Sequence, residues 1–269
     1  IGTLSAGIAH EVKNPLAGIL GNADLVSNQI RKLNIPNAGP LLNYIEVIQK
    51  ETKRCRGIID SLMRFSRQEK ATYAPMDLEV VLWETVQLVE HSLNLNKVTV
   101  VKDFANDLWM IDGNANQIEQ TLLNMVQNAG HAMPEGGTIT LSTRYFENPA
   151  AAPKGKFIAL QSEQFKGPFS RISIADTGIG MTEEVLKKIF EPFFTTKPKG
   201  VGTGLGLAVT LGILADHKAR ISIDSTPGKG TTFNMDFMAK CERNSNIVHE
   251  LEEIKKKASG GAVVSTDIS

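Results

Sequence analysis

The sequence has no net charge, only two cysteines and no long apolar run. Its 29 basic residues balance 29 acidic ones, so electrostatics gives no reason to expect nucleic acid or an anionic membrane as a partner. No apolar stretch approaches the roughly 20 residues that span a bilayer, and we expect no membrane contact within this chain. Cys55 and Cys241 lack the close spacing of a metal or redox motif, which is typical of a cytoplasmic protein with reduced thiols.

The chain begins at Ile1 rather than at methionine, and it carries no signal peptide. We therefore interpret it as a fragment of a longer protein, in which a membrane anchor would have to lie upstream. Its 269 residues suffice for two modest domains, and the hydrophobic fraction of 42% is ordinary for a globular protein.

The first 67 residues have the pattern of two amphipathic helices. Apolar residues recur at near-heptad spacing up to about Leu33 and again from Leu41 to about Arg67. Two prolines and a glycine in residues 34–40 separate the two patterns. Because such a hairpin buries little surface alone, we expect a homodimer in which two hairpins form a four-helix bundle.

A polar run at residues 10–15 interrupts the first helical pattern. His10 and Asn14 are four residues apart and share a helix face, with Glu11 beside them. A neutral imidazole nitrogen is a nucleophile near pH 7, and Glu11 is placed to accept its proton. Asn14 is placed to orient a water molecule for the reverse reaction. A lone histidine in a helix is usually structural, but polar neighbours argue against that interpretation here.

The remainder of the chain alternates between helical and strand patterns. A polar segment, residues 68–75, comes first, and residues 146–168 have the composition of a variable excursion. We expect the following helices and strands: helices at about 77–91, 114–133 and 207–216, and strands at about 98–104, 138–145, 169–175, 220–225 and 231–237.

Two motifs in this part suit a nucleotide. In the helix at 114–133, Asn124 and Asn128 present amide oxygens on one face, which suits a Mg²⁺ carried by phosphates. Asp176 follows a strand and precedes Gly178 and Gly180, so a flat base could approach the backbone and donate its amine to the carboxylate. Alone, each motif is ordinary: surface asparagines in one case and an Asp-Gly turn in the other.

A third motif is the glycine-rich run at residues 200–206, which leads into an apolar helix. Glycines and backbone amides at a helix start can hold a phosphate. The run lacks the Gly-Lys-Ser/Thr of a P-loop and the spacing of a dinucleotide-binding motif. Residues 189–197, which include Phe190, Phe193 and Phe194, precede it.

In their order, these motifs resemble the sensor histidine kinases of two-component signalling over nearly the whole chain. The run His10–Pro15 resembles the H box, 124–128 the N box and 176–180 the first glycine box. Residues 190–194 resemble the phenylalanine box, 202–206 the second glycine box and 228–230 a weaker third. Five ordered motifs are a strong signal, and the form of the H box is similar to that of nitrogen-regulating members.

The resemblance implies an α+β protein in which a dimerising helical hairpin precedes an α/β sandwich of the Bergerat type, shared with gyrase and heat-shock ATPases. We expect a dimerisation and phosphotransfer domain at 1–70, a linker at 71–76, an ATP-binding domain at 77–240, and a short helix with a flexible tail at 241–269.

The resemblance also implies roles for particular residues. His10 would accept a phosphoryl group from ATP, with Glu11 as general base, and pass it to an aspartate in the receiver domain of a response regulator; Asn14 would serve a phosphatase reaction. Asn128 would bind Mg²⁺ and Asp176 the adenine amine. The remaining nucleotide-binding residues are expected to be Asn124, His131, Gly178, Gly180, Lys197, Gly202, Gly204, Leu205, Gly206 and Thr231.

One departure concerns the end of the N box. Many members carry lysine or arginine where this chain has His131, so the permanent charge near the phosphates is missing. Two other functions stay open at this point: an ATPase of the same fold whose hairpin only dimerises, and a scaffold without activity. The stimulus, the cognate regulator and the direction of transfer within the dimer are not encoded in these motifs.

Overall fold

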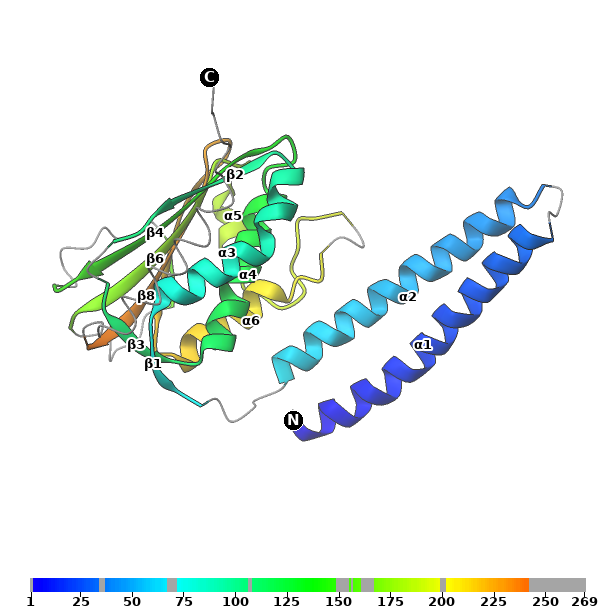
Figure 1. Cartoon of the computed structure of the whole chain (residues 1–269), viewed down its shortest axis with the longest axis horizontal. Helices are drawn as coiled ribbons and strands as arrows, with labels where there is room; N and C mark the ends of the chain where they lie inside the picture. Colours follow the sequence, from blue (N-terminus) through cyan, green and yellow to red (C-terminus); the bar gives the residue numbers. More distant parts are fainter. Residues whose placement is uncertain are drawn as a thin grey trace, which may run out of the picture. The chain divides into compact units, whose positions relative to one another are not determined.

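The computed structural model describes residues 2–33, 37–66, 72–105, 108–148, 155, 157–160, 167–198 and 202–241 (Figure 1). These residues form a helical hairpin, an α/β domain and an irregular segment that precedes the last helix in the sequence. In this described part, no helix is both long and apolar enough to cross a membrane.

The hairpin consists of α1, Gly2–Lys32, and α2, Gly39–Ser66, which lie side by side (Figure 1). Their contact buries a narrow row of small and apolar residues, among them Ala23 and Ile45. The Gln49 amide donates to the carboxylate of Asp24 across the two helices, at 2.6 Å. Pro15 lies inside α1, where it removes one backbone hydrogen bond.

A second apolar face of the hairpin is half exposed in the described part of the chain. Ile19, Val26 and Ile48 are each about half exposed, and they line a shallow groove of about 550 Å³ together with Gly18 and Ala23. Both helices contribute to this groove, so it belongs to the hairpin as a unit.

The α/β domain is built on one mixed sheet with helices on one side (Figure 1). Its elements are β1 Ala74–Met76, α3 Leu78–Leu95, β2 Val98–Asp103, β3 Met110–Gly113, α4 Ala115–His131, β4 Gly137–Phe146, β5 Phe157–Leu160, β6 Phe169–Asp176, α5 Glu183–Leu186, α6 Gly206–Asp216, β7 Arg220–Thr226 and β8 Gly230–Cys241. Within these described strands the order is β1-β3-β8-β6-β4-β2, with β7 on β8 and β5 on β7. Among the strand pairs of the described residues, only β2–β4 is parallel.

Local sequence sets where the two long helices of this domain begin. Asp77 caps α3 by accepting a hydrogen bond from the amide of Glu79 at 2.7 Å. Asn114 caps α4 in the same way, accepting from the amide of Gln117 at 3.0 Å. Capping fixes the first turn of each helix, so their apolar stripes face the sheet with a defined register.

The core lies between these helices and the sheet. Strand side chains alternate between the two faces, so Ile172 and Ile174 of β6 point toward the helices while Arg171 and Ser173 point away. Fully buried leucine, isoleucine and methionine side chains of α3, α4, β4 and β8 fill the same layer. Asp176 continues the helix-facing series of β6, which places its carboxylate at the rim of the core.

β8 is the strand on which the sheet depends most. One edge of β8 pairs with β6 from Thr231 to Met238. Residues Gly230–Asp236 of β8 also pair with β7, and Ala239 and Cys241 of β8 pair with β3. A single strand therefore joins three others.

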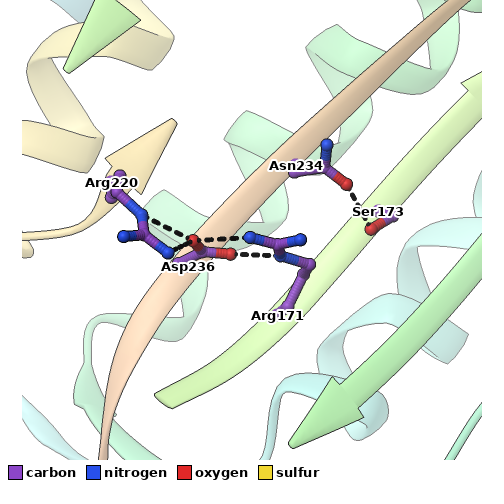
Figure 2. A network of polar contacts seen from close by, with 5 residues as sticks. All are labelled: Arg171, Ser173, Arg220, Asn234 and Asp236. Atoms are coloured by element: carbon purple, nitrogen blue, oxygen red, sulfur yellow. Dashed lines mark hydrogen bonds and ion pairs between the residues drawn. The ribbon is translucent and has the colours of Figure 1, made fainter. Parts of the chain in front are cut away.

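The outward face of the same strands carries a buried ionic network (Figure 2). Arg171, Asp236 and Arg220 oppose one another across β6, β8 and β7. The Arg171 Nε donates to Asp236 at 2.6 Å, and Arg220 donates to the other carboxylate oxygen at 2.6 Å and 2.8 Å. The Asp236 side chain is only 1% exposed, so both of its oxygens depend on these two partners.

The α+β class expected from the sequence is confirmed, with a helical hairpin followed by a mixed sheet and helices. Within the described residues, all the expected helices and strands are present, within a few residues at their ends. Four short elements were not expected: β1, β3, β5 and α5. β1 lies within the residues assigned to the linker and contains Pro75, which an edge strand tolerates because one of its edges needs no amide. The expected short helix beyond residue 241 lies outside the described residues.

Asp236→Ala should lower the free energy of unfolding by about 3–5 kcal/mol, because it leaves two arginines facing each other without their carboxylate. Denaturant unfolding of the full chain measures this effect.

Asp112→Ala provides the matched control. It removes the ion pair between Asp112 and Lys240, whose side chains are about half exposed, and should cost less than about 1 kcal/mol. Equal losses in the two variants would contradict a structural role specific to the buried network.

Candidate active site

The site is centred on Asp176, the last residue of β6. Its side chain is 8% exposed, and one carboxylate oxygen, Oδ1, accepts hydrogen bonds from the amides of Gly178 at 2.9 Å and Thr231 at 3.2 Å. Burial raises the pKa of this carboxyl, and the two amide hydrogen bonds oppose that shift. Within the described part of the chain, Oδ2 makes no hydrogen bond, which leaves it to accept one from a ligand.

The loop after Asp176 is held against three other elements. The Ile179 amide donates to the carbonyl of Ala132, at the end of α4, at 3.0 Å. The Gly228 amide, in the β7–β8 turn, donates to the Ile179 carbonyl at 2.7 Å. The Met181 amide donates to the Ser225 hydroxyl of β7 at 2.8 Å. These bonds fix the backbone on which a base would lie.

Glycine is required in this loop by close backbone approach. A Cβ at position 178 would lie 2.6 Å from the Ala132 carbonyl oxygen and 2.8 Å from Asp176 Oδ1. Gly180 has φ +64°, and its Cβ would lie 2.0 Å from the carbonyl oxygen of Thr226. A side chain at either position would displace the loop from the carboxylate.

α4 brings the expected asparagines beside this loop. Asn124 and Asn128 lie one turn apart and are half-buried, while His131, in the last turn, is exposed. The Ala132 carbonyl accepts a hydrogen bond from the Ile179 amide, so the end of α4 lies directly against the loop after Asp176.

The other expected residues lie in the irregular segment before α6 and at its start. Lys197 and Gly202 are half-buried, as are Gly204 and Gly206, and Leu205 is buried. Burial lowers the pKa of the Lys197 ammonium, and an anion beside it would oppose that shift. Gly200 lies outside the described residues.

A strained contact holds this segment together. Phe193 has φ +70°, unusual for a bulky residue, and its amide donates to the Gly204 carbonyl at 2.9 Å. Gly204 has φ +67°, and a Cβ there would lie 2.3 Å from the carbonyl carbon of Phe193. The phenylalanine motif and the second glycine motif are therefore held together by a backbone hydrogen bond and by close backbone packing between Phe193 and Gly204.

His10 and Glu11 lie in α1, but their side chains lie outside the part of the structure that is described. Asn14, one turn further along the same helix, is exposed. Their grouping on one helix face follows from the α-helical backbone.

A buried histidine that sequence reasoning missed joins the two helices that border the site. His217, just after α6, accepts a hydrogen bond at Nε2 from the amide of Asn114 at 3.0 Å, and its Nδ1 donates to the Ile213 carbonyl at 2.7 Å. The ring centroid lies 4.9 Å from that of Tyr73. Burial lowers the pKa of His217, against smaller opposing effects of Ile213 and Asp216, which keeps the ring neutral and able to accept.

Two family models match the chain. The first, described as the histidine kinase-, DNA gyrase B- and HSP90-like ATPase, matches residues 113–240, and the His Kinase A (phospho-acceptor) domain matches residues 1–71. Together they define the class of protein: a phospho-acceptor hairpin joined to an ATP-binding domain.

Curated relatives give the same result. The chain is 32% identical to sporulation kinase E of Bacillus subtilis over 87% of its length, and 35% identical to the sensor kinase CckA of Brucella abortus, also over 87%. This chain belongs to the sensor histidine kinases of two-component systems. It spans only 28% and 24% of those two relatives' own lengths.

Solved structures share the fold. Full-length ShkA in complex with AMPPNP has a TM-score of 0.64 at 22% identity, covering 90% of this chain and 47% of that one. Histidine kinase ThkA in complex with the response regulator protein TrrA has a TM-score of 0.57 at 24% identity, covering 89% of this chain and 62% of that one.

The structure thus brings together Asp176, Gly178, Gly180 and Thr231, with Asn124 and Asn128 on the adjoining helix. Two further residues were not singled out from the sequence: Ser225, beside Thr231, and His217, at the other end of α4. A single serine in a strand matches no sequence motif. His217 follows a helix whose sequence pattern is ordinary, so nothing marks it as buried or hydrogen-bonded.

Stability should fall as the pH is lowered through about 6.5, because the unfolded chain then takes up a proton that folded His217 resists. The loss should continue until the pH reaches the lowered pKa of the folded state. Denaturant unfolding between pH 7.5 and pH 5 measures this contribution.

His217→Gln should remove this part of the pH dependence, while His91→Gln, at an exposed position of α3, should keep it. Parallel stability curves for wild type and His217→Gln would contradict the assignment.

Proposed function

We propose that this chain is the catalytic portion of a sensor histidine kinase, which phosphorylates His10 with ATP and passes the phosphoryl group to an aspartate of a response regulator. The observation that carries the proposal is that one chain combines a phospho-acceptor hairpin with a buried carboxylate whose free oxygen suits an adenine amine. An ATPase whose hairpin only dimerises would leave the polar group around His10 without a role.

Adenine would be recognised by Asp176 through Oδ2, while Gly178 and Gly180 leave room for the flat ring. Burial raises the pKa of Asp176, and the two amide hydrogen bonds, which favour the ionised form that accepts from an amine, oppose this shift. Lys197 and the glycines at 202, 204 and 206, with Leu205 packed beneath, would cover the phosphates.

The residues present fit a metal carried by the nucleotide rather than one held by the protein. In the described part of the chain, no three histidine, cysteine, aspartate or glutamate side chains come together as a metal site. The amide oxygens of Asn128 and, one turn earlier, Asn124 suit a cation that has phosphate as its main ligand. Mg²⁺ bound there would neutralise phosphate charge, and exposed His131 lies at the end of the same helix.

At the acceptor, a ring nitrogen of His10 would attack the γ-phosphorus. The bond from that phosphorus to the β–γ bridging oxygen breaks, an N–P bond forms and ADP leaves, while Glu11 takes the ring proton. In the second reaction the N–P bond breaks and an aspartate oxygen takes the phosphoryl group. Asn14, on the same face of α1, would orient water for dephosphorylation.

The partner would be a receiver domain, as the ThkA–TrrA complex illustrates for a protein of the same fold. Because ATP and receiver domains are cytoplasmic, we place this portion of the protein in the cytoplasm.

The half-exposed groove on the hairpin would be covered by a second copy of the chain. Ile19, Val26 and Ile48 form an apolar stripe along both helices, which is the pattern of a four-helix bundle cut in half. A symmetric dimer would bury this stripe against itself.

His10→Gln should abolish acid-labile, base-stable phosphate incorporation from γ-labelled ATP, because no ring nitrogen is left to accept the group. It should keep the thermal stabilisation that ATP gives, since Asp176 is intact. Asp176→Asn should lose both, because an amide presents a donor as well as an acceptor to the adenine amine. Label on His10→Gln equal to wild type would contradict the proposal.

Val26→Asp combined with Ile48→Asp should convert the dimer to a monomer, since it places charge in the apolar groove. Analytical ultracentrifugation measures the mass. Leu88→Asp is the control, because Leu88 is 65% exposed on α3, outside the hairpin. A double variant that stays dimeric would exclude this groove as the interface.

A further inference from the structure

Three polar residues form one rung across the sheet at the adenine-binding site. Asp176 of β6 opposes Thr231 of β8, and Thr231 opposes Ser225 of β7. All three side chains belong to the face of the sheet that carries the helices, because residues two apart along each strand, such as Ile174 and Phe233, are core residues.

The Ser225 hydroxyl joins three segments of this region. It accepts a hydrogen bond from the Met181 amide at 2.8 Å, lies 3.2 Å from the Gly230 carbonyl, and lies 2.9 Å from the Thr231 hydroxyl. In the contact with Thr231, either oxygen can be the donor. No other hydrogen bond involves the Thr231 hydroxyl within the described part of the chain.

One proton on Ser225 allows two arrangements. Ser225 can donate to the Gly230 carbonyl and accept from Thr231, which turns the Thr231 proton away from a ligand. Alternatively, Ser225 donates to the Thr231 hydroxyl and no longer donates to the Gly230 carbonyl, which is its longest contact at 3.2 Å. The Thr231 hydroxyl proton is then free to donate to a ligand. The Met181 amide occupies one lone pair of Ser225 in both cases, so the serine oxygen keeps its place.

Adenine presents a donor and an acceptor side by side: the exocyclic amine and the neighbouring ring nitrogen, N1. Asp176 can only accept, so it matches the amine. In a direct contact, the next residue along the rung, Thr231, would then have to donate to N1. That requires the second arrangement.

We propose that Ser225 is a positioning residue for base recognition: it orients the Thr231 hydroxyl as a donor toward N1 of adenine. This role rests on the proposed ATP-binding function. The Met181 amide holds Ser225 at the sheet rung, and Thr231 transmits its effect to the ligand. Asp176 and Ser225 thus act on adjacent positions of the base from the two sides of Thr231.

The test compares ATP with 1-deaza-ATP, in which a C–H replaces N1 while the amine is kept. Ser225→Ala should raise the Kd for ATP about three- to tenfold, the value of one hydrogen bond, and should change the Kd for 1-deaza-ATP less than about twofold. The KM for ATP should rise accordingly, while the rate of phosphorylation at saturating ATP stays unchanged.

A double-mutant cycle locates the effect. In a Thr231→Val background, Ser225→Ala should change the ATP affinity less than about twofold, because Thr231 is the route of its action. Ser173→Ala is the matched control, since it deletes a hydroxyl that donates to Asn234 at 2.7 Å on the opposite face (Figure 2). This control should bind both nucleotides as the wild type does.

Equal weakening of both nucleotides by Ser225→Ala would show a merely structural role and overturn the inference. So would full additivity with Thr231→Val. Failure of the proposed function looks different, because wild type and Ser173→Ala would then bind no ATP. If Ser225→Ala does not fold, Ser225→Cys, which keeps a weaker donor, should give the same nucleotide selectivity with a smaller ratio.

Discussion

The buried carboxylate of Asp176 is the constraint from which the rest of the nucleotide site follows. A carboxylate with so little exposure needs hydrogen-bond donors, and the chain supplies two backbone amides, one from the following loop and one from β8. To bring those amides within reach, the loop must approach β6, α4 and the β7–β8 turn more closely than any side chain permits. The glycines at 178 and 180 are thus a consequence of stabilising the charge, as well as an opening for the base.

The two parts of the chain bury apolar surface in different ways. The α/β domain closes its own core between α3, α4 and the sheet, with almost every large apolar side chain of that layer inaccessible. The hairpin covers only one stripe and leaves another half exposed. The stability of the first is therefore set by folding of one chain, whereas in the proposed dimer that of the second would depend on association and so on concentration.

Much of this could be predicted from the sequence, because the long elements have strong patterns. The amphipathic stripe of α4, with Asn124 and Asn128 opposite it, and the order of the glycine motifs identify an ATP-binding domain behind a phospho-acceptor hairpin. The short strands β1 and β3 escape prediction, since three or four residues carry no periodicity and pairing alone defines them. Ser225 and His217 escape for another reason: their partners lie in distant segments that only the tertiary fold brings together.

β8 has a consequence for how the protein is made. Strands β3, β6 and β7 each need it as a neighbour, and Thr231 near its start supplies one of the two amides that Asp176 requires. During synthesis β3 and β6 leave the ribosome well before β8 does, so the sheet stays incomplete until nearly the whole domain has emerged. A chain that ends before β8 would lack the Thr231 amide, so Asp176 would keep only the Gly178 amide as a donor.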